Sequence, residues 1–216
     1  MKKITAIIPV RKGSVRVKNK NLKPFAGTNL LEIKIKQLKR INFIDKIVVS
    51  SDCDEMLKIA IDYGVEAHRR DEYFASSKAD NSEYFHNLAE SISGEYLMYS
   101  PVTCPLISKE TYFDCINTFQ NEDVENLVTV APVKHHMWLD NKPLNYKIEA
   151  SPNSQDLPEI LRITYGVCVN SNKNMIKCKN VVGQNPFFVK LTEKEAVDID
   201  DMIDFKFAEF LKTQGD

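Results

Sequence analysis

The chain has 216 residues, of which 43% are hydrophobic and 27% are charged, and its formal net charge is -1. These values are typical of a soluble globular protein with one large domain, and they indicate neither disorder nor a membrane-embedded chain. The sequence pI of about 6.4 disfavours a general nucleic-acid-binding protein, which usually carries an overall basic excess.

The chain begins with Met1-Lys2-Lys3 and a short apolar run, 4–10, that superficially resembles a signal peptide. The run contains Thr5 and is followed by Arg11 without a small-residue cleavage pattern. It is too short for a membrane span and is typical of a buried first strand, so we expect a cytoplasmic protein without a membrane partner.

A cation-rich loop, 11–23, follows this strand. Eight Lys/Arg residues precede the first acidic residue, Glu32, and six of them lie in the loop. A loop that leaves the carboxyl end of a first strand is where α/β proteins bind phosphates, because ammonium, guanidinium and backbone N–H groups together neutralise a polyanion. Gly13 permits backbone conformations closed to other residues. We favour phosphate contact for Arg11, Ser14, Lys20 and Asn21, and exposure to water for Arg16, Lys18 and Lys23.

Short apolar strands alternate with amphipathic, helix-length segments along the chain, a pattern typical of a mostly parallel sheet covered on both faces. Thr28 is the expected cap of the first helix, and Asp52 or Asp54 that of the second. In chain order we expect strand 4–10, helix 28–40, strand 46–50, a helix ending near residue 64, strand 65–68, helix 81–92, strand 95–100, helix 109–120, strands 126–133, 162–170 and 187–191, and helix 200–212.

Between 134 and 156 the periodicity deteriorates, and Pro143, Pro152 and several Asn indicate an irregular excursion or a small hairpin. We therefore expect one α/β domain, 1–216, with an inserted arm at about 134–160. Within that arm, adjacent His135 and His136 point oppositely in an extended segment and favour a structural or interface role over a metal site. Trp138 indicates a buried or subunit-contacting patch.

Polar residues follow the second and third expected strands. Ser50-Ser51-Asp52 and Arg69-Arg70 both stand at strand carboxyl ends, so both could border one crevice. We favour helix capping for Asp52 and expect one of the two arginines to reach a bound nucleotide. The five cysteines show no zinc-binding spacing, and most of them are expected to be small core hydrophobes in a reducing compartment.

Asp198 and Asp200, followed by Asp204, form an acidic cluster near the end of the chain. Two carboxylates one residue apart in an extended segment project to the same side and repel each other. A hard cation such as Mg2+, bound by oxygen ligands and substrate phosphates, would compensate them. Capping of the last helix by Asp200 and Asp201 explains the motif equally well. The cationic loop in the same chain favours the metal interpretation.

Seven short motifs occur in a fixed order between residues 4 and 209. They are Ile8-Pro9-Val10-Arg11-Lys12-Gly13-Ser14 with Lys20-Asn21, Ser50-Ser51-Asp52, Arg70-Asp71-Glu72-Tyr73-Phe74-Ala75, Val102-Thr103-Cys104-Pro105-Leu106, His135-His136-Met137, Gln155-Asp156-Leu157-Pro158, and 198–204. This ordered set resembles the acylneuraminate cytidylyltransferases (CMP-sialic acid synthetases), which activate acidic sugars. The resemblance covers nearly the whole chain.

The resemblance implies a three-layer, Rossmann-like nucleotide-diphospho-sugar transferase fold, with the arm crossing to a second subunit of a homodimer. It implies an enzyme of CMP-sugar biosynthesis for cell-surface polysaccharide, which transfers CMP from CTP to a sialic-acid-like or other 2-keto-3-deoxy acid and releases pyrophosphate. Mg2+ and the cations would stabilise charge as an acceptor oxygen attacks the α-phosphate. The implied residues are Arg11, Lys20, Asp198 and Asp200 for catalysis, the two aspartates holding Mg2+; Arg11, Gly13, Ser14, Lys20, Asn21, Arg70 and Ala79 for CTP; and Pro101, Thr103, Gln155 and Tyr165 for the acceptor.

The departures from the family pattern fall on the acceptor side. Pro101 and Ser154 stand where sialic-acid members have Gln and Arg, and Tyr165-Gly166 replaces an N-G pair. Loss of an arginine that could pair with a carboxylate indicates an atypical acid acceptor, or a phosphorylated or phosphonylated non-sugar acceptor. A nucleotide-binding loop and a D-x-D motif also occur in metal-dependent glycosyltransferases, and a non-catalytic nucleotide-binding protein could carry them too. In glycosyltransferases, however, the D-x-D motif usually follows a mid-sheet strand.

Overall fold

Seven strands form the central sheet of the computed structural model, which describes residues 1–121 and 123–214. The strands are β1 (Ile4–Pro9), β2 (Lys46–Ser51), β3 (Glu66–Arg69), β4 (Tyr96–Tyr99), β5 (Asn126–Val133), β8 (Ile160–Ser171) and β9 (Phe187–Lys190). Their order is β3-β2-β1-β4-β8-β5-β9. β8 runs antiparallel to both of its neighbours, and every other pair is parallel. The predicted mostly parallel sheet is confirmed.

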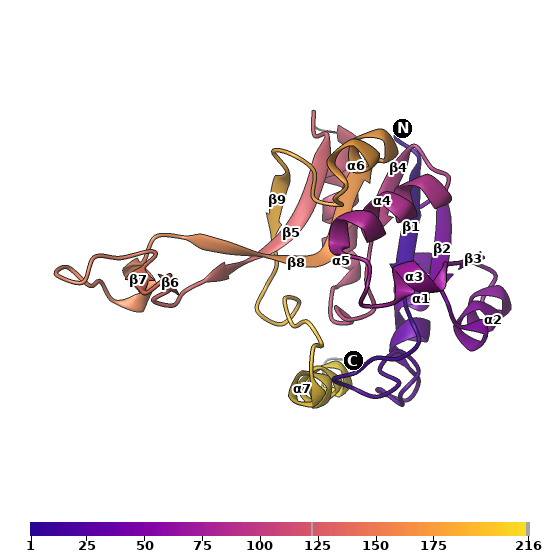
Figure 1. Ribbon diagram of the computed structural model, residues 1–216, viewed down its shortest axis with the longest axis horizontal. Helices are drawn as coiled ribbons and strands as arrows, with labels where there is room; N and C mark the ends of the chain where they lie inside the picture. The colour runs from indigo at the N-terminus through magenta and orange to yellow at the C-terminus, as the bar shows by residue number, and fades with distance from the viewer. Residues whose placement is uncertain (122, 215–216) are drawn as a thin grey trace.

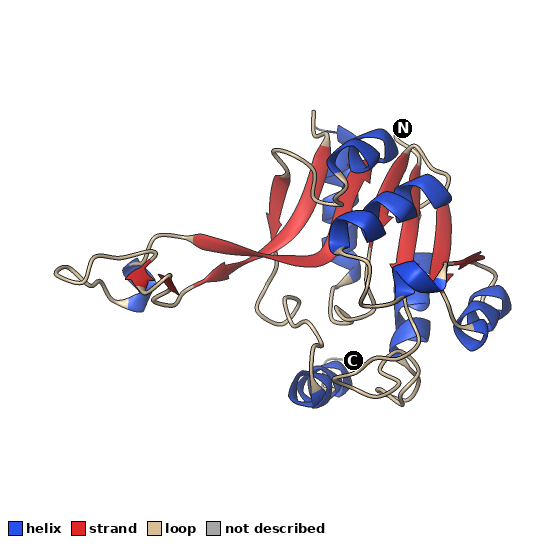
Figure 2. Cartoon of the chain, viewed as in Figure 1, coloured by secondary structure: helices blue, strands red, loops and turns tan. Residues whose placement is uncertain are grey.

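Helices cover both faces of this sheet and complete three layers (Figure 2). Buried side chains of α1, α2, α5 and α7 belong to the core on one face, and those of α4 and α6 to the core on the other. The bounds are α1 Leu30–Lys39, α2 Asp54–Asp62, α3 Glu72–Ala75, α4 Asn81–Ser91, α5 Lys109–Asn121, α6 Asn172–Cys178 and α7 Met202–Thr213. Among the described residues, no helix has the length and apolarity needed to cross a bilayer.

Strand β1 shows how a central strand supplies both layers. Ile4, Ala6 and Ile8 belong to one core cluster, and Ile7 to the other. Because successive side chains point to opposite faces, a strand covered on both sides must be apolar at nearly every position. The apolar run at the start of the chain, interrupted only by Thr5, is therefore explained by a position in the middle of the sheet.

The predicted caps of the first two helices are wrong. Asn29, not Thr28, is the N-cap of α1 and accepts from the Glu32 N–H, while the Thr28 hydroxyl donates to the Glu32 carboxylate. Cys53 is at the N-cap of α2 without a side-chain bond. Asp52 instead accepts from the backbone N–H of Lys12 at 2.9 Å, so its carboxylate anchors the cationic loop.

The arm leaves the body between β5 and β8 and extends far beyond it (Figure 1). It contains the small hairpin β6 (Trp138–Leu139) and β7 (Lys142–Pro143) and the short helix η1 (Ser154–Asp156). The hairpin therefore matches one of the two forms predicted for this segment. Trp138 is 53% exposed, so the chain itself does not bury it. Several other large apolar side chains of the arm are also exposed: Leu139, Leu144 and Ile148.

Candidate active site

A cavity of about 570 Å³ lies at the carboxyl ends of β1 and β4. Residues far apart in the sequence line it, including most of the predicted site residues: Arg11, Ser14, Lys20, Asn21, Arg70, Ala79, Pro101, Thr103, Tyr165, Asp198 and Asp200. The cationic loop and the aspartate pair thus share one cavity.

Two of the predicted residues do not line it. Gly13 adopts φ +79°, a left-handed conformation that glycine alone adopts freely, and it shapes the loop next to Ser14. Gln155 lies in η1 on the arm and is exposed. A role for Gln155 at an active site therefore depends on the predicted crossing of the arm to another subunit.

The cationic wall of the cavity is fixed by hydrogen bonds to backbone carbonyls. Arg11 Nη1 donates to Ala75 O at 3.0 Å, and Lys20 Nζ donates to Ile199 O at 2.6 Å. The Asn21 side-chain amide is buried and donates to Arg11 O at 3.0 Å. Burial lowers the pKa of Lys20, although the charges of Asp198 and Asp200 oppose that shift.

Arg70, not Arg69, reaches the cavity. Arg70 is only 3% exposed, donates to Tyr84 Oη at 3.1 Å and contacts Val10 O. Its buried Nε has no hydrogen-bond partner among the described residues. Arg69 forms an exposed ion pair with Asp54. The side chain of Arg70, which follows β3, therefore reaches the end of β1 past the intervening strand β2, at the edge where the carboxyl ends of these parallel strands meet.

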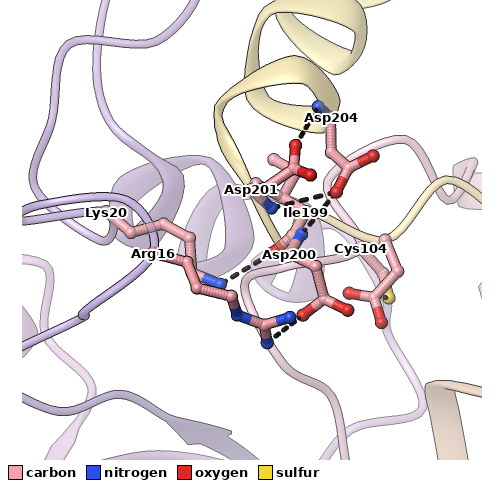
Figure 3. A network of polar contacts seen from close by, with 8 residues as sticks. Arg16, Lys20, Cys104, Ile199, Asp200, Asp201 and Asp204 are labelled. Carbon is pink, nitrogen blue, oxygen red and sulfur yellow. Dashed lines mark hydrogen bonds and ion pairs between the residues drawn. The ribbon is translucent and has the colours of Figure 1, made fainter.

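The acidic wall lies just before α7 (Figure 3). Asp201 caps this helix by accepting from Ile203 N and Asp204 N, and Asp204 Oδ2 accepts from Asp200 N and Asp201 N. Capping is thus carried by Asp201 and Asp204, and the side chains of Asp198 and Asp200 face the cavity instead. The alternative explanation by helix capping therefore holds for Asp201 but not for the Asp200 side chain.

The environment of Asp198 disfavours a negative charge. Burial raises the pKa of the Asp198 carboxyl, and the Asp200 charge adds to that effect. A hydrogen bond from Thr103 and the charges of Lys20 and Arg162 act in the opposite direction. Two repelling carboxylates at the edge of a partly buried cavity would be stabilised by a bound cation.

Arg16 was expected to face water, but it also contacts the acidic wall. Its side chain is 65% exposed, lines the cavity and forms an ion pair of 2.5 Å with Asp200, as Figure 3 shows. The two residues stand 184 positions apart, so sequence reasoning missed the pair. The only sequence signal was membership of Arg16 in the cationic loop.

Aromatic side chains form a third wall, of which only Tyr165 was among the predicted site residues. Tyr84, Phe85, Tyr99 and Tyr165 line the cavity, and the Phe85 ring centroid lies 5.5 Å from Tyr99 and 6.4 Å from Tyr165. The rings come from three different elements, α4, β4 and β8, so no local sequence pattern indicates that they lie together. The wall can contact a ligand by apolar and stacking interactions in addition to charge.

Tyr165 lies on an irregular part of β8. The register between β5 and β8 shifts between Val128 and Val130, and Tyr165 adopts φ +55°. Thr129 bridges the irregularity, because its hydroxyl accepts from Val167 N at 2.9 Å and bonds Thr164 Oγ1 at 2.8 Å. Bulges of this kind re-aim side chains, here placing Tyr165 at the cavity.

The donor set of the acidic wall fits Mg2+. No cluster of three or more His, Cys, Asp or Glu that could hold a metal occurs among the described residues. Mg2+, however, is commonly held by one or two carboxylates and completes its octahedron with substrate phosphates and water. Asp198 and Asp200 could supply the protein's share of such a site.

Comparison with known proteins gives a consistent result. Residues 5–155 match the family model described as cytidylyltransferase. The chain is 27% identical to post-translational flagellin modification protein B of Campylobacter coli, over 98% of this chain and 95% of that protein. It is 25% identical to pseudaminic acid cytidylyltransferase of Campylobacter jejuni, over 95% of this chain and 94% of that one.

The fold is similar to that of solved structures. CMP:2-keto-3-deoxy-manno-octonic acid synthetase complexed with CTP superposes with a TM-score of 0.71, over 98% of this chain and 99% of the other. The two sequences are only 11% identical, so this similarity concerns the fold.

Proposed function

The chain belongs to the cytidylyltransferase family, and we propose that this CTP-dependent enzyme transfers CMP to an acidic sugar with release of pyrophosphate. The observation that carries the proposal is the joint cavity of about 570 Å³, which the cationic loop and the Asp198–Asp200 pair line together. A nucleoside triphosphate complexed with a divalent cation matches this arrangement of charges.

In this proposal the cations bind the triphosphate. Arg11 and Lys20 neutralise its charge, while Ser14 and Asn21 donate hydrogen bonds. Arg70 and Ala79 border the rest of the nucleotide. Because Arg11 and Lys20 are already anchored on carbonyls, they need little reorganisation when negative charge develops on the departing pyrophosphate.

Asp198 and Asp200 would hold Mg2+, which supplies electrostatic stabilisation of the phosphates during transfer. The protein's own contribution is the placement of these two carboxylates. Thr103 O accepts from Ile199 N at 2.9 Å, and Lys20 Nζ holds Ile199 O from the other side. The residue between the two aspartates is therefore fixed at both of its backbone polar groups.

The acceptor is proposed to lie beside Pro101, Thr103 and Tyr165. An acidic sugar is favoured because the similar protein of Campylobacter jejuni is named for pseudaminic acid. The aromatic wall and the departures at Pro101 and Tyr165 support an acceptor that differs from sialic acid itself, and a phosphorylated or phosphonylated acceptor is the second candidate.

We also propose that the arm pairs two subunits and brings Gln155 to the partner's cavity. The support is the exposure of apolar side chains along the arm, including Trp138 and Leu144. Apolar surface of this kind on a projecting hairpin is typical of a subunit contact.

A pyrophosphate-release screen tests the function. The purified protein is incubated with CTP, Mg2+ and, separately, a panel of 2-keto-3-deoxy acid sugars and a panel of phosphorylated and phosphonylated acceptors. We expect release with an acid sugar, dependent on CTP and not matched by UTP. Release only with phosphorylated or phosphonylated acceptors would favour the second candidate. Saturable Mg–CTP binding without release under any acceptor would contradict both.

A further inference from the structure

Lys34 is a fully buried ammonium in α1. Its side chain is 0% exposed, and Nζ donates to Cys104 O at 2.9 Å and to Tyr112 Oη at 2.7 Å. No carboxylate forms an ion pair with it among the described residues. Burial lowers the pKa of Lys34 to about 8. A buried, unpaired charge is costly to the fold, so its presence calls for a function.

Both hydrogen-bond partners of Lys34 connect it to one turn, residues 100–107. Cys104 belongs to the turn, and Tyr112 Oη bonds Ser100 Oγ at 2.7 Å at its other end. Gln37, also on α1, donates from Nε2 to Pro105 O at 2.7 Å and to Ile107 O at 3.1 Å. Side chains of α1 thus satisfy three carbonyls of the 100–107 turn.

The same turn supports two walls of the cavity. Pro101, Val102 and Thr103 line the cavity directly. Thr103 O accepts from Ile199 N at 2.9 Å, and Cys104 Sγ lies 3.9 Å from Asp198 Oδ1. The residue whose carbonyl Lys34 holds therefore contacts one of the carboxylates proposed to bind the cation.

Lys34 is suited to this role because an ammonium offers several donors from one point. Methionine would fill a similar volume, but it would leave Cys104 O without its donor and would disconnect α1 from Tyr112. A displacement of the turn by a fraction of an ångström would move Thr103 and Asp198 together, and reacting groups tolerate such displacements poorly.

We propose that Lys34 is a positioning residue for cytidylyl transfer: its buried ammonium holds the 100–107 turn so that Thr103 and Asp198 keep their places in the cavity. The catalytic part of this inference rests on the proposed function. Lys34 itself is not among the residues that line the cavity.

The test compares Lys34→Met with the wild type and with Lys36→Met, a matched variant two positions along α1 whose side chain is exposed. The first readout is hydrogen–deuterium exchange, which needs no acceptor. In Lys34→Met we expect amides of the 100–107 turn and of residues 198–200 to exchange about tenfold faster or more. The melting temperature should be unchanged or raised, because a buried charge has been removed. Lys36→Met should match the wild type in both measurements.

The second readout is steady-state kinetics with the acceptor found in the screen. For Lys34→Met we expect kcat to fall about tenfold or more while KM for CTP stays near the wild-type value, because the cationic wall is untouched. Tyr112→Phe, which keeps the bond to Cys104 but removes the link to Ser100, should give a smaller loss.

Three outcomes would overturn the proposal. They are unchanged exchange of the turn in Lys34→Met, faster exchange without any change in kcat, and a lower melting temperature with every kinetic parameter falling together. If the wild type turns over no acceptor, the proposed function fails, while the exchange comparison still decides whether Lys34 holds the turn.

Discussion

Asp200 contacts two elements of the molecule, one through its carboxylate and one through its backbone N–H. Its side chain pairs with Arg16 of the cationic loop, while its backbone N–H is bound by Asp204 of α7. The neighbouring Asp201 is devoted to capping. Two adjacent aspartates therefore have different roles. The Asp200 carboxylate can take part in chemistry, and the Asp201 carboxylate stabilises the start of α7.

This division predicts different results for two isosteric substitutions. Asp200→Asn removes a charge from the acidic wall, so we expect kcat/KM for pyrophosphate release to fall about 100-fold or more, with a higher Mg2+ requirement. Asp201→Asn should retain near wild-type activity, since Asn is an equally good N-cap. Undiminished turnover by Asp200→Asn across a Mg2+ titration would show that the metal assignment is wrong.

Lys34 predicts how stability changes with pH. In the fold its pKa is lowered to about 8, whereas the ordinary value is 10.5. Below the folded-state value both states carry the proton, and the buried charge destabilises the fold. Between the two values the unfolded state binds more protons, so stability rises with pH as this cost of roughly 3 kcal/mol is relieved.

Urea unfolding of the wild type and of Lys34→Met at about pH 7 and about pH 10 measures this effect. The free energy of unfolding of the wild type, relative to that of the variant, should increase by up to roughly 3 kcal/mol with rising pH. If the free energy of unfolding of the two proteins changed with pH in the same way, Lys34 would not be held in a desolvated, charged state.

At the scale of elements, the irregularity in β8 sets the acceptor end of the cavity. Tyr165 has φ +55°, where a bulky residue is strained and Asn is better tolerated. We expect Tyr165→Asn to keep the wild-type melting temperature and Mg–CTP affinity but to change KM for the acceptor by about tenfold. Differential scanning fluorimetry and acceptor titrations check this. Loss of Mg–CTP binding would instead place Tyr165 on the nucleotide.

The position of the elements was largely predictable from hydrophobic periodicity, whereas their ends were not. The predicted strand 126–133 coincides with β5, because this mostly apolar segment is buried along most of its length. The short helices α3 and α6 were not predicted, since segments of that length carry no periodic signal. The N-cap is the residue at which the backbone leaves the helical conformation. Thr28 and Asn29 are both suitable cap residues, so the sequence did not show that Asn29 occupies this position.

At the scale of the whole molecule, the prediction of an acylneuraminate cytidylyltransferase-like enzyme is confirmed, and a non-catalytic nucleotide-binding protein is set aside. This prediction was possible because each of the seven ordered motifs is a short segment that can be recognised in the sequence by itself. Arg16 and Lys34 were missed because their partners are 184 and 70 residues away. Contacts between residues so far apart arise only when the chain folds, and no pattern in the neighbouring sequence indicates them.

The arm predicts an assembly. If its exposed apolar side chains form a subunit contact, Trp138→Ser combined with Leu144→Ser should weaken dimerisation about 100-fold or more, measured by light scattering across a concentration series. Phe210→Ser on α7 is a matched control, because this residue is 58% exposed but lies outside the arm. A wild-type protein that is monomeric at all concentrations would contradict the prediction.

The ion pair between Arg16 and Asp200 affects the order in which Mg2+ and CTP are expected to bind. In the ligand-free protein a guanidinium already supplies the counter-charge of Asp200, so a bare divalent ion must displace it. We therefore expect Mg2+ to bind weakly by itself and to enter as the preformed complex with CTP, whose phosphates offer Arg16 another anion. Titration calorimetry with MgCl2, with and without a non-hydrolysable CTP analogue, would reveal tight metal binding in the absence of nucleotide if this ordering does not hold.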